Sequence, residues 1–400
     1  MINRLLFYLF LLLLPTQLGK HFFLDFSYLS GVRVDYLAPT IYLTDILVLL
    51  LAIFNFKTIF KFFKNKKVII GLFLLLINVL LSRLPVVSFY WFIKIIEFLI
   101  IFSLAKKILM TLKEKYILAT LLISGLFQLF LSLVQLINKH SVQGLFYYFG
   151  ERLLSLSAPG VAKASLGGIE FLRPYGTFSH PNSLSGFFLL LYFFVLTYKK
   201  FNRYLVLKYL FLLVSSLLIF ISFSKIAILS YLFLNGIYYI LTIKSTKVVC
   251  KPCIIARILI IIVVSFIFLQ ATTDPLTINK RIELMKNSTA IILRYPIQGV
   301  GLGSYLIEQA KYSSKYYLFF NQPVHNIFLL FISETGLIIS GLIFLFSFKT
   351  ISQFIRTNIY IFLTLVLTGL FDHYWLTLQQ NFLLMGLVMG VILSRTLPVD

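Results

Sequence analysis

Long runs of apolar residues constrain the fold of this chain more than any other feature. Runs of about 17 to 22 such residues recur, and an α-helix of about 20 residues covers the hydrocarbon core of a bilayer. The chain is 60% hydrophobic and 12% charged, and its mean hydropathy is +0.96. These features predict an all-α polytopic membrane protein in which residues 1–400 form a single integral membrane domain.

The apolar runs predict about twelve membrane-spanning helices. The first run is interpreted as a helix and not as a secretory signal, because no small-residue cleavage site follows it. The expected spans are 4–18, 41–56, 68–83, 87–105, 116–138, 181–198, 204–222, 224–243, 254–271, 325–348, 357–372 and 374–394.

The basic residues predict the orientation of these spans. The net charge is +23, and dense Lys and Arg clusters follow alternate spans, which is typical of cytoplasmic loops. This placement puts both chain ends inside and the long loops 139–180 and 272–324 outside, the second lying between spans nine and ten. The charge therefore follows from topology in a cytoplasmic membrane, and no nucleic-acid partner is implied. The clusters are Lys57, Lys61, Lys64, Lys66 and Lys67; Lys106, Lys107, Lys113 and Lys115; Lys199, Lys200, Arg203 and Lys208; and Lys244, Lys247, Lys251 and Arg257.

With this orientation the polar side chains of a working site are external, where no ATP is available. Most acids fall on that side, and so do all five histidines, His21, His140, His180, His325 and His373. The two cysteines stand in "CKPC" on an inner loop, Cys250 and Cys253. Two ligands do not close a zinc site, so we interpret them as reduced thiols. The sequence contains no cluster of metal-ligand type and no inverted repeat typical of secondary transporters.

The stretch "RPYGTFSHPNSLSGFFLLL", residues 173–191, places polar groups directly before an apolar run. An unpaired charge near hydrocarbon costs several kcal/mol. Arg173 is either a snorkelling interfacial residue or a ligand contact, and the Pro-Asn helix start at Asn182 favours the second reading. His180 either caps the next helix or contacts the ligand.

The second long loop begins with a segment that resembles an interfacial helix, residues 281–295, which Pro296 ends. Arg281 and Arg294 are thirteen residues apart, about 140° round a helix, so they cannot both reach one phosphate. Each of the two is a candidate contact for a ligand. The glycines of "GVGLGS", Gly299, Gly301 and Gly303, predict a tight turn with a possible backbone contact to a ligand. The tyrosines that follow favour interfacial anchoring over sugar stacking: Tyr305, Tyr312, Tyr316 and Tyr317.

His325 and Asn326 stand at the head of a long apolar helix. His325 is interpreted either as a functional group at the outer mouth of a span or as a cap of the helix start. Gly336 follows eleven residues later, which would bring it to within about 20° of the histidine's face. Glu334 would point away and pair with a neighbouring helix.

Three further positions carry charge near membrane spans. Lys225 lies between two closely linked spans and is costly there unless it faces a cavity. Lys94 and Glu97, one turn apart, predict a structural ion pair. Asp372 and His373 sit at the outer end of a span and are candidates to line the same cavity as His325.

Together, "RPYGTFSHPNSLSG" and "PIQGVGLGSY…HNIFLLFISETGLIISG" resemble the O-antigen ligase and O-antigen polymerase family of bacterial envelope proteins. His325, Asn326 and Gly336 are similar to that family's His-Asn, nine residues, Gly signature. Ile339 departs from a small or aromatic position of the pattern, although Gly341 lies close by. Lys225 in "ISFSKIAILSY" stands where the family usually has arginine.

The resemblance implies transfer of a glycan from undecaprenyl diphosphate to a hydroxyl acceptor on a lipid, a glycan or a protein, outside the cytoplasmic membrane and without metal or cofactor. Such a reaction needs cations to hold the diphosphate and one base. Arg173, Arg281 and Lys225 can supply the cations, and His325 the base, because neutral imidazole is available near pH 7.

Two rival classes fit the sequence less well. A lipid-linked oligosaccharide flippase would need polar residues through the whole membrane depth, whereas here they gather at the outer face. A glycosidase would need two carboxylates that flank the scissile bond. The candidate acids show no recognisable pairing: Glu151, Glu170, Asp274, Glu283 and Glu308.

Overall fold

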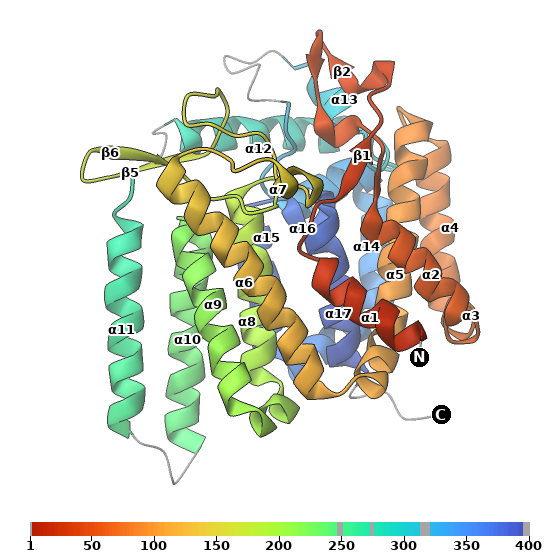
Figure 1. The fold of residues 1–400 in the computed structure, drawn as a ribbon. Coiled ribbons are helices and arrows are strands. Elements are labelled where there is room, and N and C mark those ends of the chain that lie inside the picture. Colours follow the sequence, from red (N-terminus) through yellow and green to blue (C-terminus); the bar gives the residue numbers. More distant parts are fainter. Residues whose placement is uncertain (1, 246–250, 273–275, 313–320, 395–400) are drawn as a thin grey trace.

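The computed structural model describes residues 2–245, 251–272, 276–312 and 321–394, and Figure 1 shows a bundle of helices with a loop-rich region at one end. We call this region the cap; it comprises the described parts of residues 14–42, 139–180 and 270–326. The opposite end of the bundle is called the base. Both long loops predicted from the sequence therefore lie in the cap, at the same end of the molecule.

The bundle agrees closely with the helices expected from the sequence, because each of the predicted spans contains a helix. The bundle helices are α1 (Ile2–Leu13), α2 (Leu43–Phe54), α4 (Lys66–Leu80), α5 (Pro85–Thr111), α6 (Glu114–Asn138), α8 (Pro181–Thr197), α9 (Leu205–Ile221), α10 (Lys225–Ser245), α11 (Lys251–Leu269), α14 (Ile327–Thr357), α15 (Ile359–Gly369) and α17 (Gln379–Leu393).

Helix length limits how many of these helices qualify as membrane spans. By length and composition, 4 described helices are long and apolar enough to cross a membrane: α5, α6, α10 and α14. Helix α2 and the short α3 (Phe56–Phe63), which meet at a bend of 90°, would together form a fifth. Six other apolar helices have only 10–17 residues in the described part of the chain. The count of about twelve spans is thus not established.

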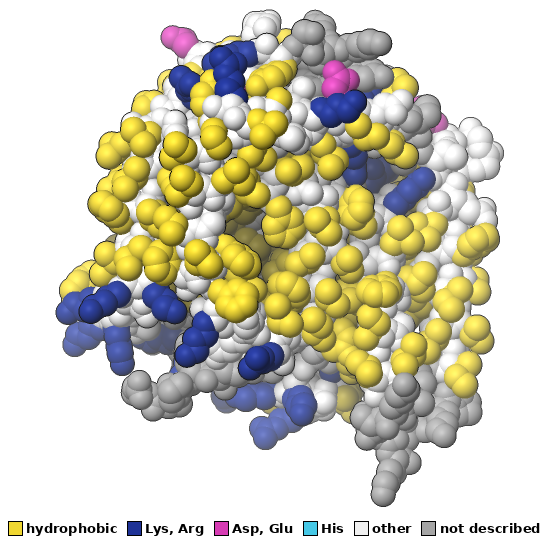
Figure 2. Space-filling model, turned by 180° about the vertical axis from the view of Figure 1, so that it is seen from behind, with side chains coloured by type: hydrophobic (Ala, Val, Ile, Leu, Met, Phe, Trp, Pro, Cys, Tyr) yellow, Lys and Arg dark blue, Asp and Glu magenta, His cyan; other side chains and the backbone are white. Residues whose placement is uncertain are grey.

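Side-chain types are sorted along the axis of the bundle. Figure 2 shows hydrophobic side chains over the middle of one face, and Lys and Arg side chains gathered mainly towards the base. An apolar belt with a basic rim is what an integral membrane protein presents to lipid and to the cytoplasmic interface.

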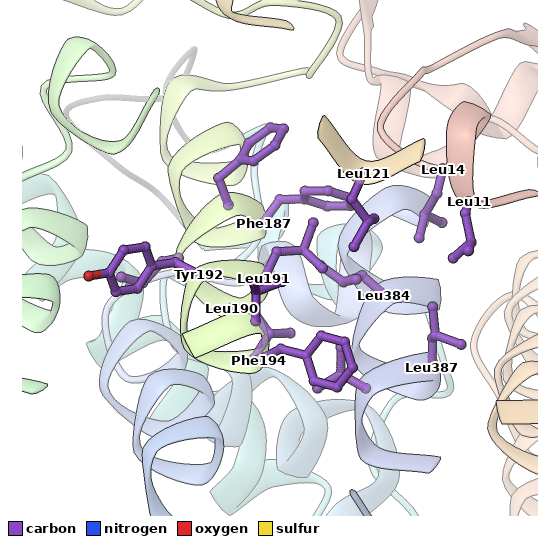
Figure 3. Packing of buried hydrophobic residues seen from close by; sticks show 14 of the residues in the cluster. Leu11, Leu14, Leu121, Phe187, Leu190, Leu191, Tyr192, Phe194, Leu384 and Leu387 are labelled. Atoms are coloured by element: carbon purple, nitrogen blue, oxygen red, sulfur yellow. The ribbon is translucent and has the colours of Figure 1, made fainter. Parts of the chain in front are cut away.

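Helix α8 occupies the centre of the bundle. Every residue from Pro181 to Leu196 is buried, as expected for a helix that is apolar on all sides. Figure 3 shows how its side chains, including Phe187 and Leu191, pack against Leu121 of α6 and Leu384 of α17. Because protein surrounds α8 completely, its first turn is a fixed platform at the cap end.

The cap contains three short antiparallel strand pairs that the sequence patterns did not predict. The expected all-α class is therefore correct for the bundle and incomplete for the cap, since strands of 2 to 4 residues carry too little alternation to be recognised. The pairs are β1 (Gly19–His21) with β4 (Thr40–Tyr42), β2 (Tyr28–Leu29) with β3 (Val32–Arg33), and β5 (Lys163–Leu166) with β6 (Ile169–Leu172).

Short helices complete the chain. The predicted interfacial helix is α12, which ends at Arg294, two residues before Pro296. It buries Leu284 and Ile291 and exposes Ile282 and Leu293. The elements not yet given are η1 (Asp25–Ser27), η2 (Asp35–Leu37), α7 (Leu145–Tyr148), η3 (Lys199–Arg203), α12 (Thr277–Arg294), α13 (Tyr305–Gln309) and α16 (Tyr374–Thr377).

Helix α14 is broken at Gly336, whose φ of 76° and ψ of 165° are not helical. The glycine loop of the cap enters this break. Leu337 N donates a hydrogen bond to Pro296 O at 2.7 Å, and Gly301 N donates one to Glu334 O at 2.8 Å. The loop thereby satisfies backbone groups that the break would leave without partners.

The break overturns one expectation from helical geometry. Gly336 does not return to the face of His325, because the helix is not continuous at that point. Glu334 has a neighbouring helix as a partner, as expected, because its carboxyl group interacts with the backbone amides of Gly303 and of Tyr305, the first residue of α13. The glycine loop is a tight turn, as expected, and it contacts α14.

Other local expectations have mixed outcomes. The Lys94–Glu97 ion pair is confirmed at 3.4 Å, and Asp45 joins it. Tyr305 is 1% exposed, so it is a core residue and the anchoring role predicted for it is wrong. Tyr312 packs against the buried hydrophobic cluster that contains Tyr305. Tyr316, Tyr317, Cys250 and the side chain of Cys253 lie outside the described residues.

We predict that Gly336→Ala strongly destabilises the protein. The backbone at Gly336 lies in a region that only glycine adopts readily, and an added Cβ would clash with the backbone oxygen of Ile297. Strain of this kind costs about 1–3 kcal/mol before the clash is counted. Thermal unfolding of the purified protein measures the effect. Gly341→Ala is the matched control, because a Cβ added there would have nothing within 4 Å; equal melting temperatures for the two variants would contradict the prediction.

Candidate functional site

Polar residues from four parts of the chain meet where the cap joins the bundle. Residues 173–182 lead into α8 and residues 325–326 lead into α14. Residues 370–373 connect α15 with α16, and Arg281 reaches this connection from α12. Segments far apart in sequence therefore form one polar site above the buried platform of α8.

A chain of hydrogen bonds joins an arginine to a carboxylate across this site. Arg173 is 8% exposed; its Nη2 donates to Asn182 Oδ1 at 2.6 Å, and its Nε donates to Ser222 O at 2.9 Å. Asn182 Nδ2 in turn donates to Asp372 Oδ2 at 2.8 Å. A buried cation and a buried anion are thus linked through one amide, while Arg173 Nη1 makes no hydrogen bond with any described residue.

His325 lies beside this carboxylate. Its Nδ1 is 3.4 Å from Asp372 Oδ1, and its side chain is 11% exposed. The cap of α14 is Asn326, whose Oδ1 accepts hydrogen bonds from the backbone N of Phe328 and of Leu329. The reading of His325 as the helix cap is therefore wrong, and its ring remains directed at the site.

His373 also belongs to the site and lies beside both His325 and Tyr36. Its ring centroid is 5.2 Å from that of His325 and 5.4 Å from that of Tyr36. Its backbone N donates to Asp372 Oδ1 at 2.8 Å, and its Nδ1 is 2.7 Å from Thr377 Oγ1. The Asp372 carboxylate thus accepts hydrogen bonds at both oxygens while it faces His325.

The two arginines of α12 are separated, as the sequence predicts. Arg281 Nη1 donates to Phe371 O at 3.1 Å, next to Asp372. Its Nε is buried and has no hydrogen-bond partner among the described residues. Arg294 lies at the other end of the helix, 3.5 Å from the buried Glu308, and the structure does not bring it to the site.

His180 and Lys225 lie close to the site in different ways. His180 is the N-cap of α8, and its Nδ1 accepts a hydrogen bond from Asn182 N at 3.1 Å, so the capping reading is confirmed. Lys225 is the exposed first residue of α10, three residues after Ser222, the acceptor of Arg173. Lys225 makes no hydrogen bond or ion pair with other described residues.

Burial controls the charges of the basic groups. It lowers the pKa of Arg173 to about 10, so the guanidinium remains charged at pH 7. Burial and the charge of Arg173 lower the pKa of His180 to about 3. Burial also lowers the pKa of His373 to about 3, although Asp372 acts in the opposite direction. Both histidines are therefore neutral at pH 7.

The single carboxylate of the site stays ionised. Burial acts to raise the pKa of Asp372, but His325, His373 and Arg281 outweigh it and hold that pKa well below its ordinary value. At neutral pH two arginines and one aspartate then meet here. The excess of positive charge, with unused guanidinium donors, suits an anionic ligand such as a phosphate.

His325, Asp372 and His373 are also residue types that ligate metals, and their ligand atoms lie within 4.8 Å of one another. Hydrogen bonds to Thr377, Asn182 and the backbone already occupy most of these atoms. The arrangement therefore fits proton transfer better than cation binding.

Sequence patterns missed the contribution of residues 14–42. A cavity of about 760 Å³ lies under the cap, and Tyr36 and Thr377, the neighbours of His373, form part of its wall. Its lining is rich in aromatic and polar side chains, among them Gln17, Tyr42, Tyr90, Trp91 and Arg152. The dense aromatic and polar composition of residues 16–42 was the available signal.

The chain also resembles a known protein family over part of its length. Residues 210–346, from α9 to the first part of α14, match the model of a family described as O-antigen ligase. The matched segment includes Arg281, His325 and the glycine loop. No curated protein matches the chain.

We predict that the folded protein loses stability as the pH falls from about 6.5 to about 3. Unfolded histidine titrates near 6.5, whereas His180 and His373 have folded pKa values of about 3, so protonation in this window favours the unfolded state. Thermal unfolding between pH 7 and pH 4 measures this loss. His373→Gln should lose less than the wild-type protein, and His140→Gln, an exposed control, should behave like wild type. If His373→Gln lost as much stability as the wild-type protein, His373 would not be a source of this pH dependence.

Proposed function

Since the match over residues 210–346 supports assignment to the O-antigen ligase and polymerase family, we propose that this integral membrane protein is a glycosyltransferase. It transfers an undecaprenyl-diphosphate-linked oligo- or polysaccharide to a hydroxyl acceptor, at the outer face of the cytoplasmic membrane. The observation that carries the proposal is the meeting of His325 and Asp372 with Arg173 and Arg281.

The donor diphosphate binds to the two arginines. Arg173 and Arg281 each keep guanidinium donors that no described residue uses, and guanidinium groups bind phosphate oxygens in pairs. Lys225, exposed at the nearby turn, adds a third positive charge. These cations stabilise the charge that develops on the departing diphosphate.

His325 is the base of the reaction. Its Nδ1 faces Asp372, which leaves Nε2 to take the proton of the acceptor hydroxyl, and a carboxylate in this position orients the ring. The acceptor oxygen bonds to the anomeric carbon of the donor sugar as the bond from that carbon to the diphosphate breaks. Undecaprenyl diphosphate leaves, and His325 releases its proton to solvent. Asp372 is a positioning residue.

The acceptor occupies the cavity under the cap. Tyr36 and Thr377 line this cavity and also contact His373, so its inner wall adjoins the reacting groups. Aromatic faces and planar polar groups suit sugar rings, which offer both C–H surfaces and hydroxyls. Arg33 and Arg152 both pair with the single carboxylate of Asp35, so these three groups of the cavity wall leave one net positive charge.

The proposed orientation places the cap outside and the base in the cytoplasm. The polar site lies at the cap, whereas the clusters of basic residues lie mainly towards the base, as the positive-inside rule requires. About twelve helices would then cross the bilayer, the shorter ones within the bundle. Helices α8 and α9, of 17 residues each, cover about 25 Å, close to the hydrocarbon thickness.

A transfer assay tests the proposal. The purified protein in nanodiscs receives a lipid-linked oligosaccharide and a glycan or glycolipid acceptor. We expect release of undecaprenyl diphosphate together with a longer or newly attached glycan, at a rate that a metal chelator does not change. Glycan that remains on its lipid but crosses the bilayer of a proteoliposome would instead support a flippase.

We predict that His325→Ala lowers the transfer rate by about 10²- to 10⁴-fold, the usual contribution of a general base. Donor binding and thermal stability should change little, since Asn326 and not His325 caps α14. Asp372→Asn should reduce the rate less and alter the pH–rate profile, because it removes the charge that orients the ring. His140→Ala is the control. A folded His325→Ala protein that keeps more than about a tenth of wild-type activity would place the base elsewhere.

We predict that Arg281→Ala raises the donor KM by about ten- to a hundredfold, the loss expected for a charged hydrogen bond. Arg281→Lys should recover only part of the affinity, since lysine lacks the bidentate contact. Arg294→Ala removes the same charge from the same helix and is the matched control. Equal donor KM values for Arg281→Ala and Arg294→Ala would exclude Arg281 from the donor site.

A further inference from the structure

A second cavity, of about 540 Å³, lies among α8, α9, α10 and α11. It is remote from His325, because most of its residues come from the basal halves of these helices, whereas the proposed catalytic groups lie at the cap. Two cations line it, Lys208 and Arg257. Tyrosine side chains form much of the remaining wall: Tyr192, Tyr209, Tyr231, Tyr238 and Tyr239.

No acidic residue of these helices balances the two cations. The sequence from Phe171 to Thr273 contains no aspartate or glutamate. Lys208 is 5% exposed, and its Nζ donates only to neutral acceptors, Leu196 O at 2.9 Å and Asn202 Oδ1 at 2.7 Å. Neither Lys208 nor Arg257 forms an ion pair within the described part of the chain. Buried positive charge without a counter-ion is costly, so an anion from outside the chain would be stabilising here.

Arg257 is placed to bind that anion. Its guanidinium carbon lies 5.3 Å from the ring centroid of Tyr209, and the hydroxyl groups of Tyr209 and Tyr239 also interact with it. The aromatic contact fixes the position of the guanidinium at the rim of the cavity. The guanidinium plane can then bind two phosphate oxygens, while tyrosine hydroxyls offer further donors.

The rim of the cavity carries exposed apolar side chains. Leu213 of α9 is 57% exposed and Ile260 of α11 is 62% exposed, and both line the cavity. A free phosphate would leave these side chains uncovered, whereas acyl chains that lie between α9 and α11 would cover them. Charge and apolar surface together thus identify a lipid, not a soluble anion, as the occupant.

We propose that this cavity binds an anionic phospholipid of the leaflet at the base. The phosphate contacts Lys208 and Arg257, and the acyl chains lie along Leu213 and Ile260. A zwitterionic lipid is disfavoured, because its ammonium group would bring a further positive charge to two uncompensated cations. The site is independent of the proposed glycan transfer.

Lipid titration of the full-length protein in detergent tests this proposal, with native mass spectrometry and melting temperature as readouts. The probes are phosphatidylglycerol, phosphatidylcholine and inorganic phosphate. We expect phosphatidylglycerol alone to bind and stabilise. Arg257→Gln and Lys208→Gln should each weaken its binding about fivefold, the share of one cation near an anionic lipid.

Two exposed basal cations outside the cavity provide matched controls, Arg203→Gln and Lys199→Gln. They remove the same charges and should leave binding within about twofold of wild type. Equal losses in control and cavity variants would show a diffuse basic surface and overturn the proposal. Equal binding of phosphatidylcholine, or equal stabilisation by inorganic phosphate, would overturn it as well. If Lys208→Gln does not fold, the exposed Arg257→Gln decides the outcome.

Discussion

The two hydrogen bonds of the Asn182 side chain hold the site together. They join Arg173 on one side to Asp372 on the other, and Asn182 and Asp372 are 190 residues apart in the sequence. A buried cation and a buried anion each carry a large desolvation cost, and an amide that both donates and accepts satisfies both without neutralising either. Asn182 lies in the first turn of α8, which is buried on all sides, so a helix that protein surrounds fixes the distance between the arginine and the carboxylate.

The break in α14 performs a second positioning task. At Gly336 the helix opens, and the glycine loop that follows α12 is hydrogen-bonded into the gap. Ser288 of α12 meets Ser333 of α14, with hydroxyl oxygens 2.8 Å apart. Helix α12 is therefore attached to the N-terminal part of α14, which begins directly after His325 and Asn326. In the proposed reaction this attachment sets Arg281 relative to the base, which gives a physical reason for a glycine at a fixed distance after the histidine.

The sequence predicts structural features that depend on local composition. It does not predict features that depend on how distant segments fold against one another. Apolar runs located the helices, and the polar stretch before α8 led to Arg173 and Asn182. Helical phase along α14 gave a wrong position for Gly336, because a regular period cannot anticipate a glycine that leaves the helix. Tyr36 could not be predicted to contact His373, since that contact depends on how residues 14–42 fold back over the bundle. The separation of Arg281 from Arg294 was predictable because α12 is a regular helix.

The positions of the acidic residues explain why Arg173 and Lys208, near the two ends of α9, remain available to bind an anion. In α5, Lys94 is paired internally with Asp45 and Glu97. From Phe171 to Thr273 the sequence offers no carboxylate, and two cations there bond to neutral oxygens: Arg173 to Ser222 O beside the cap end of α9, and Lys208 to Leu196 O near its basal end. A carboxylate within reach of either would compete with phosphate for the same donors. Asp372 is tolerated near Arg173 because an amide stands between them and its charge is directed at His325.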